Sequence, residues 1–239
     1  KGRSPALLWF NPDCDERAGQ AGHTPRKAVL EMQKDLSHLP LFWAQTDDIV
    51  LVHKQPSHSL LDTLQRLKFP LPEFLVWSSK VPLSIQHPRL RELRPWGWAP
   101  NMDTVVGPVR ARVHERSPTR WNADWGKWYS KANSQDELRA WARAYPTLGE
   151  SNLATAGITC HSMAEIPGEK DRYPILLKAP YSTSGRHRLR LTQPEYTQHQ
   201  EQWIRKTIQR QGAVVAEPLL HRLADFSIHL QNDQKPCIT

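Results

Sequence analysis

The first third of the chain alternates between short apolar runs and stretches whose apolar side chains recur at helical spacing. Three apolar runs have the length of buried strands, namely residues 7–10, 49–52 and 73–77. Two segments have the helical spacing, namely residues 24–39, which open on Thr24-Pro25, and residues 60–67. A loop is expected at residues 13–23, before the first of these helices. Strand, helix, strand, helix and strand in this order predict a parallel sheet with helical crossovers.

Prolines interrupt the pattern over residues 78–145, and one further helix is expected there. Residues 134–145 place Leu138, Trp141 and Ala142 on one side of that helix, behind Ser134 as its cap. We expect a domain boundary between residues 108 and 122. The predicted domains are therefore residues 1–115 and residues 116–239.

The last third is patterned as strands around one helix. Residues 173–179 and 188–192 are predicted strands that flank a polar, glycine-containing loop, which is typical of a hairpin. A helix is expected between Pro194 and Gly212, because Gly212 suits a left-handed C-terminal cap. Apolar runs at residues 213–216 and 226–231 predict two more strands, joined by a linker at 217–224. The expected fold class is α/β, with α+β character in the second half.

The chain carries a formal net charge of +8, which admits nucleic acid, phosphate ligands or acidic substrates as partners. The charge is concentrated, because residues 172–194 contain five basic side chains and no acidic one. Three cysteines, far apart in the sequence, do not suggest a disulfide framework. No apolar run is long enough to span a membrane. We therefore expect a cytoplasmic protein without a membrane partner.

The loop after residues 173–179 has the composition of an anion-binding segment. Lys178 ends the predicted strand, and Ser182, Thr183, Ser184 and Gly185 follow in the loop. The lysine supplies positive charge for phosphate, while hydroxyl and backbone N–H groups supply hydrogen bonds. The Walker A and dinucleotide-binding glycine patterns are both absent. An ordinary hairpin turn explains the loop, taken alone, as well as a phosphate site does.

The order of lysine strand, small-residue loop, helix, valine-rich strand and linker resembles the ATP-grasp superfamily, which includes D-alanine–D-alanine ligases, glutathione synthetases and biotin carboxylases. The resemblance implies an enzyme that uses ATP and Mg²⁺ to join a carboxylate to an amine or a thiol. It implies phosphate binding by Lys178 and a flexible loop made of Ser182, Thr183, Ser184 and Gly185. It further implies an adenine linker and a ribose-binding acid: Glu217, Pro218, Leu219 and Leu220 for the linker, and Asp225 for the acid.

ATP-grasp proteins also have an earlier lysine near the start of the nucleotide-binding region. Lys127 is the candidate here, Lys131 is the alternative, and a plain surface lysine is the third reading. Asn11-Pro12, Thr24-Pro25 and Pro95-Trp96-Gly97-Trp98 resemble a group of bacterial ATP-grasp proteins that have no assigned activity. The resemblance thus implies a pre-ATP-grasp-like parallel α/β domain followed by a partial ATP-grasp domain.

The magnesium ligands of the family lie on strands well beyond the ribose-binding acid. Only 14 residues follow Asp225, so these ligands are not in the sequence, and we expect the chain to be truncated. A chain that has lost the metal site is the alternative. Pro218 stands where many ATP-grasp proteins have a lysine, and proline has no N–H. Adenine would then be read by neighbouring backbone groups, such as those of Glu217 and Leu220.

Three functions are open from the sequence. The first is an ATP-dependent ligase that activates a small-molecule or peptide carboxylate as an acylphosphate. The second is a catalytically inactive ATP-grasp-like module that binds ATP or a partner. The third is a basic nucleic-acid-binding protein, which we disfavour because tryptophans such as those in residues 110–128 more often pack in a core.

The arginines of residues 110–128 can instead hold a substrate carboxylate. Scattered histidines and cysteines argue against zinc. No catalytic residue and no metal ligand is assigned, and a homo-oligomer stays open.

Overall fold

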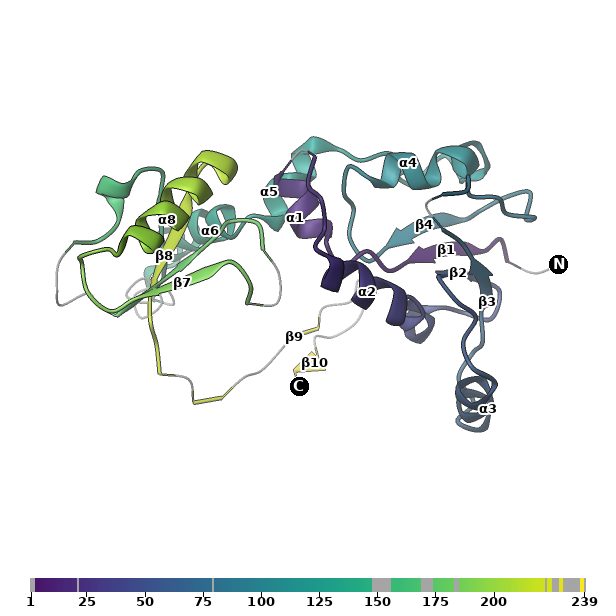
Figure 1. Ribbon diagram of the computed structural model, residues 1–239. Helices are drawn as coiled ribbons and strands as arrows, with labels where there is room; N and C mark the ends of the chain where they lie inside the picture. The colour runs from purple at the N-terminus through teal and green to yellow at the C-terminus, as the bar shows by residue number, and fades with distance from the viewer. Residues whose placement is uncertain are drawn as a thin grey trace.

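Two four-stranded sheets lie side by side in the computed structural model (Figure 1). The structure describes residues 3–20, 22–78, 80–147, 156–168, 174–182, 185–221, 223–224, 228–229 and 237–238. Each sheet has its own buried core. Two short helices that contact each other lie between the sheets, α1 (Cys14–Gly19) and α5 (Gly126–Tyr129). The α1 helix therefore places residues from the start of the chain beside its C-terminal half.

The first sheet is parallel throughout and has the strand order β3-β2-β1-β4. Its strands are β1 (Ala6–Trp9), β2 (Ile49–Val52), β3 (Glu73–Val76) and β4 (Glu92–Pro95). Every residue of β1 and β2 is buried, because both faces of the sheet are covered. The predicted parallel sheet is confirmed, and β4 is a strand that the sequence pattern did not predict.

Three helices accompany this sheet: α2 (Lys27–Asp35), α3 (His58–Arg66) and α4 (Met102–Val106). The predicted loop at residues 13–23 is wrong in part, because it contains α1. The predicted start of α2 at Thr24 is also wrong, since the helix begins after Arg26, which has an extended backbone and no side-chain cap. A 3-10 helix, η1 (Leu39–Trp43), follows with Pro40 in its first turn.

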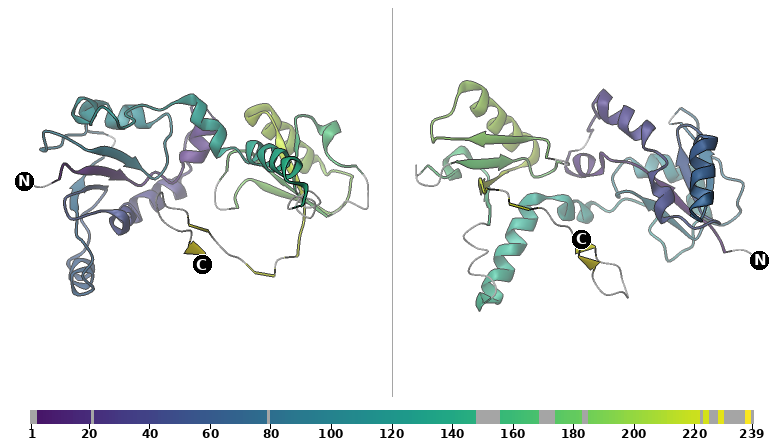
Figure 2. Two further views of the ribbon diagram at one scale, coloured as in Figure 1. Left: turned by 180° about the vertical axis from the view of Figure 1, so that it is seen from behind. Right: turned by 90° about the horizontal axis from the view of Figure 1, so that it is seen from below.

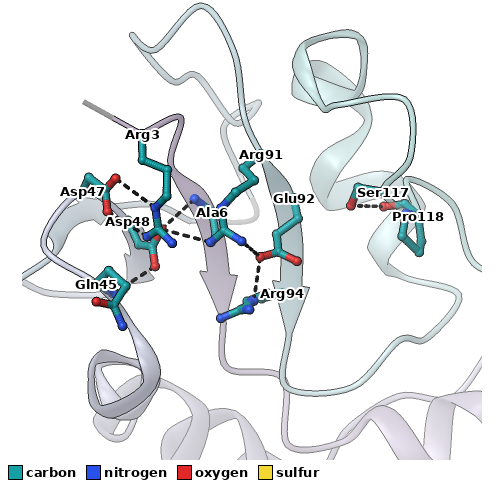
Figure 3. A network of polar contacts seen from close by, with 10 residues as sticks. All are labelled: Arg3, Ala6, Gln45, Asp47, Asp48, Arg91, Glu92, Arg94, Ser117 and Pro118. Carbon is teal, nitrogen blue, oxygen red and sulfur yellow. Dashed lines mark hydrogen bonds and ion pairs between the residues drawn. The ribbon is translucent and has the colours of Figure 1, made fainter. Parts of the chain in front are cut away.

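A buried carboxylate fastens the start of β1 to its neighbours (Figure 3). Asp48 is fully buried and accepts hydrogen bonds from the backbone N–H of Ala6 at 2.8 Å and of Gln45 at 2.9 Å. The guanidinium of Arg3 lies 2.9 Å from Asp48, and that of Arg91 lies 3.6 Å from it. Asp48 directly precedes β2 and Arg91 directly precedes β4. The Asp48 carboxylate therefore links the starts of three adjacent strands, β2, β1 and β4.

The middle of the chain forms short turns and one long helix. The turns are η2 (Gly107–Arg112) and η3 (Ala123–Trp125), and the long helix is α6 (Lys131–Ala144). The predicted cap of α6 is wrong, because the side chain of Ser130 accepts the capping hydrogen bond from Asn133, whereas Ser134 lies inside the helix. The helix therefore begins earlier than predicted, at Lys131.

The second sheet is antiparallel throughout, with the strand order β5-β8-β6-β7. Its strands are β5 (Ile158–Cys160), β6 (Ile175–Lys178), β7 (Arg188–Leu191) and β8 (Val214–Pro218). The predicted hairpin of β6 and β7 is confirmed. A short turn, η4 (Met163–Glu165), follows β5, which the sequence pattern did not predict.

Helices contact the second sheet on both faces. Ile204 of α8 (Gln198–Gln211) packs in the core with Leu177 and Ala216. α6 contacts β5 and β8, and it projects from this part of the molecule when the chain is seen from below (Figure 2). Thr197 caps α8 in a capping box, so the predicted start at Pro194 is a few residues early. The predicted C-terminal cap is confirmed, since Gly212 has φ 82°.

Two short strands, β9 (Ile228–His229) and β10 (Cys237–Ile238), pair with each other apart from both sheets (Figure 1). β9 lies within residues 226–231, where a strand was expected, and β10 lies beyond them. Across the ranges given above, no helix combines the length and the apolar character needed to cross a membrane.

Candidate functional site

Two strands of the second sheet bring Lys178 and Glu217 together on the face opposite α8. Ile175 and Leu177 belong to the core under α8, so the alternation of β6 turns Lys178 to the other face. The carboxylate of Glu217, on β8, accepts a hydrogen bond from the Lys178 ammonium in an ion pair. The Lys178 side chain is 30% exposed, so a ligand can still reach the ammonium.

Lys131 approaches the same region from the first turn of α6. Its ammonium donates hydrogen bonds to the carbonyl oxygen of Ser182 and, at 3.1 Å, to the Ser182 hydroxyl. Burial lowers the pKa of Lys131, the carboxylate of Asp15 opposes that shift, and the ammonium of Lys178 adds to it. Two ammonium groups therefore repel each other beside the β6–β7 loop. We call Lys131, Lys178, Ser182, Asp15 and Glu217 the two-lysine cluster.

Asp15 of α1 brings a carboxylate from the N-terminal part of the chain to this cluster. Burial raises the pKa of the Asp15 carboxyl, while the Cys14 thiol and the Lys131 ammonium work against that rise. The Cys14 thiol donates to Asp15 at 3.6 Å, and burial is the main cause that raises the pKa of Cys14 to about 12. Cys14 is therefore a protonated donor and not an activated nucleophile.

Hydrogen bonds within the hairpin hold the described ends of the β6–β7 loop. The Ala179 N–H donates to the carbonyl oxygen of His187 at 2.9 Å, and both Gly185 and His187 have left-handed backbone, with φ 67° and 50°. The buried hydroxyl of Ser182 donates to the carbonyl oxygen of Ala179 at 3.3 Å. Two predicted loop residues, Thr183 and Ser184, lie outside the described residues.

A side-chain amide of α8 clamps the backbone of the same loop. The Tyr181 N–H donates to Oε1 of Gln211 at 2.9 Å, and Nε2 of Gln211 donates to the Tyr181 carbonyl oxygen at 3.3 Å. The Tyr181 ring lies directly over Gly19 of α1, where a Cβ atom would come within 1.9 Å of the ring. The loop is thus fixed between α8 on one side and α1 on the other.

Of the two lysines considered for the earlier phosphate contact, the structure brings Lys131 to the loop. Lys127 is exposed, and its ammonium lies 4.9 Å from the centroid of the Trp128 ring. The choice between them was ambiguous in the sequence because it depends on where α6 begins. Lys131 is its first residue, and Ser130 caps it.

The predicted adenine linker begins as strand. Glu217 and Pro218 are the last two residues of β8, and the Leu219 N–H donates to the carbonyl oxygen of Pro174 at 3.0 Å. Leu220 is 61% exposed. Asp225, the predicted ribose-binding acid, lies outside the described residues. The Leu219 N–H already has a partner, so hydrogen bonds to an adenine base would have to come from Leu220 and the residues after it.

Two of the arginines in residues 110–128, where a substrate carboxylate was an alternative, are engaged in the fold. Arg110 binds Asp103 at 3.1 Å, and Arg112 donates to the carbonyl oxygen of Ile85. Trp121 and Trp125 pack edge to face with ring centroids 6.1 Å apart. Arg110, Arg112, Trp121 and Trp125 are therefore held by neighbours within their own part of the fold.

Within the described ranges, no group of three or more histidine, cysteine, aspartate or glutamate side chains is arranged to hold a metal ion. A comparison of the chain with models of known protein families finds no match, and a comparison with curated proteins finds no relative.

Proposed function

We propose that the two-lysine cluster binds the phosphates of ATP, and that the protein is an ATP-dependent ligase that joins a carboxylate to an amine or a thiol. One observation carries this proposal. Lys131 and Lys178 come from different elements, Lys131 binds the loop that follows β6, and the two ammonium groups are close enough for Lys178 to lower the pKa of Lys131. Such convergence of positive charge on a loop with hydroxyl groups suits an anion.

The electrostatics of the cluster fit a phosphate group. Lys131 donates to two neutral oxygen atoms of Ser182, and its pKa is lowered by burial and by the second ammonium. An anion between the two ammonium groups would offset this repulsion and raise the pKa of Lys131. Glu217 balances Lys178 at present, so a bound phosphate would share the Lys178 ammonium with that carboxylate.

ATP, when bound, supplies the phosphoryl group that turns a carboxylate into an acylphosphate. The two ammonium groups would balance the charge of the phosphates as that group leaves. The loop at Ser182 would exclude water from the reacting atoms. We further propose a cytoplasmic protein, since the buried thiols of Cys14 and Cys160 are unpaired and suit a reducing compartment.

Calorimetric titration of ATP into variants of the full chain tests this function. We expect Lys131→Ala and Lys178→Ala each to weaken ATP binding by at least about tenfold, a loss of about 1.4 kcal/mol. Lys127→Ala is the matched control, because this exposed lysine lies four positions before Lys131 and contacts Trp128. Circular dichroism verifies that each variant is folded. ATP binding that is unchanged in both cluster variants would refute the proposal.

A further inference from the structure

A second group of cations lines a cavity of about 500 Å³ between the N-terminal part of the chain and α8. Arg26 comes from the start of α2, Arg186 from the β6–β7 loop, and Lys206 and Arg210 from α8. These elements are far apart in the sequence, so the fold itself gathers the charges. The volume is in the range of pockets that hold small molecules.

The cavity has an excess of positive charge. Among the residues the structure describes, none of these four cations has an ion-pair partner. Glu16 is the one carboxylate among the lining residues. Four permanent positive charges around one carboxylate favour a ligand that carries more than one negative charge.

Two imidazoles already face the carboxylate of Glu16. Nε2 of His23 lies 3.5 Å from one carboxylate oxygen, and Nε2 of His187 lies 3.6 Å from the other. Among the described residues, neither cation on α8 forms a salt bridge with Glu16. In addition, Nε2 of His23 is buried and has no hydrogen-bond partner. His23 is one of the residues that line the cavity, so a small shift of its ring would let a polar ligand atom supply the missing bond.

The positive field acts on the histidine between these groups. Burial lowers the pKa of His187, and the guanidinium groups of Arg26 and Arg186 lower it further, as does His23, while Glu16 works against them. Arg26 and Arg186 are therefore close enough to act on one shared point of the cavity wall.

This cavity is separate from the two-lysine cluster. Lys131, Lys178 and Glu217 lie on the α6 side of the second sheet, and none of them lines the cavity. The cavity is lined by Trp203, Lys206 and Arg210 on the α8 side. The loop segment at Ala179–Ser182 runs between the two sites, with the Ser182 hydroxyl near Lys131 and the Tyr181 backbone bonded to Gln211.

We propose that this cavity binds a small molecule with two or more ionised phosphate or carboxylate groups, and that it does so independently of the two-lysine cluster. Guanidinium groups pair with either anion through two parallel hydrogen bonds, and three of the four cations are arginines. This proposal does not depend on the proposal that the two-lysine cluster binds ATP, because the two sites use different residues.

Calorimetry with pyrophosphate and with citrate, each titrated into the full chain at about 0.15 M salt, tests the proposal, since that ionic strength screens diffuse surface attraction. We expect at least one of the two probes to bind. We also expect Arg26→Ala and Arg210→Ala to weaken that binding by about tenfold or more. Arg205→Ala is the matched control, because Arg205 is on the same helix but pairs with Glu201 at 2.7 Å. Comparison of the two probes shows whether phosphate or carboxylate is preferred.

The two-lysine cluster provides the second control. We expect Lys178→Ala to weaken the tighter probe much less than Arg210→Ala does, and Arg210→Ala to weaken ATP binding much less than Lys178→Ala does. Three results would overturn the proposal: neither probe binds, Arg210→Ala behaves like Arg205→Ala, or Arg210→Ala weakens ATP as much as the probe. The last result would make the cavity part of the nucleotide site. If ATP does not bind but a probe does, the proposal for this cavity stands.

Discussion

Replacement of Gly19 by alanine is expected to loosen the junction between α1 and the β6–β7 loop. A Cβ atom at this position would lie 1.9 Å from Cγ, 2.2 Å from Cδ2 and 2.4 Å from Cβ of Tyr181. These atoms are near the root of the side chain, so a rotation of the ring tip cannot relieve the overlap. The loop or the helix must move instead.

The magnitude follows from the contact distance and from what holds Tyr181. Ordinary contact begins at 3.4 Å, so the ring must retreat by about 1.5 Å, the difference between 3.4 and 1.9 Å. The two hydrogen bonds between the Tyr181 backbone and Gln211 resist that movement. Overpacking of this kind costs about 1–3 kcal/mol. A glycine in a helix otherwise gains stability from the change to alanine.

Urea unfolding of the full chain measures this effect, and Gly107→Ala is the control. Gly107 has φ −45°, which alanine adopts freely, and no atom lies within 4 Å of the Cβ position. We expect Gly107→Ala to be neutral or to stabilise by up to about 1 kcal/mol. Adding Tyr181→Ala to Gly19→Ala should recover part of the lost stability, since the clash is then absent. A Gly19→Ala protein as stable as Gly107→Ala would show that Tyr181 does not pack on α1.

Three further perturbations test other parts of the fold. Burial lowers the pKa of His187 below 6.5, so as the pH falls the unfolded chain binds a proton at this residue before the folded chain does. The free energy of unfolding should therefore fall as the pH drops below about 6.5, and it should fall less steeply in His187→Asn. Denaturant titrations at several pH values measure this difference. Asp48→Ala leaves the buried N–H of Ala6 unbonded and should destabilise the protein by about 3–5 kcal/mol in urea unfolding. Asp47→Ala should change little, because the Asp47 side chain is 35% exposed and its ion pair with Arg3 lies at the surface. Ile204→Ala opens a cavity in the second core and should lower the free energy of unfolding by about 2–5 kcal/mol.

Elements with a strong apolar signal were predictable from the sequence. β2 matches its predicted bounds because residues 49–52 are buried on both faces and include β-branched side chains. The β6–β7 hairpin was found because its two runs flank a polar, glycine-containing loop. Gly212 was found because a left-handed cap has a clear residue preference.

Elements that depend on tertiary pairing were not predictable. In β4 only Leu93 is buried, so the strand exists through its ladder with β1 and not through its own pattern. α1 has six residues and little apolar character, so no periodicity marked it, and Asp15 was missed with it. The difference between Lys127 and Lys131 depends on the capping hydrogen bond at Ser130, since Ser134 is an equally good cap in sequence terms.

The pKa of Lys131, measured by NMR on ¹³Cε-labelled protein with and without ATP, tests the central claim most directly. Lys131→Arg assigns the signal, and the signal of Lys127 serves as the internal reference. We predict that in the absence of ATP the pKa of Lys131 lies below that of an exposed lysine, because the side chain is buried next to a second ammonium. ATP should raise it, while the Lys127 signal stays unchanged. A Lys131 pKa that does not respond to saturating ATP would contradict the account.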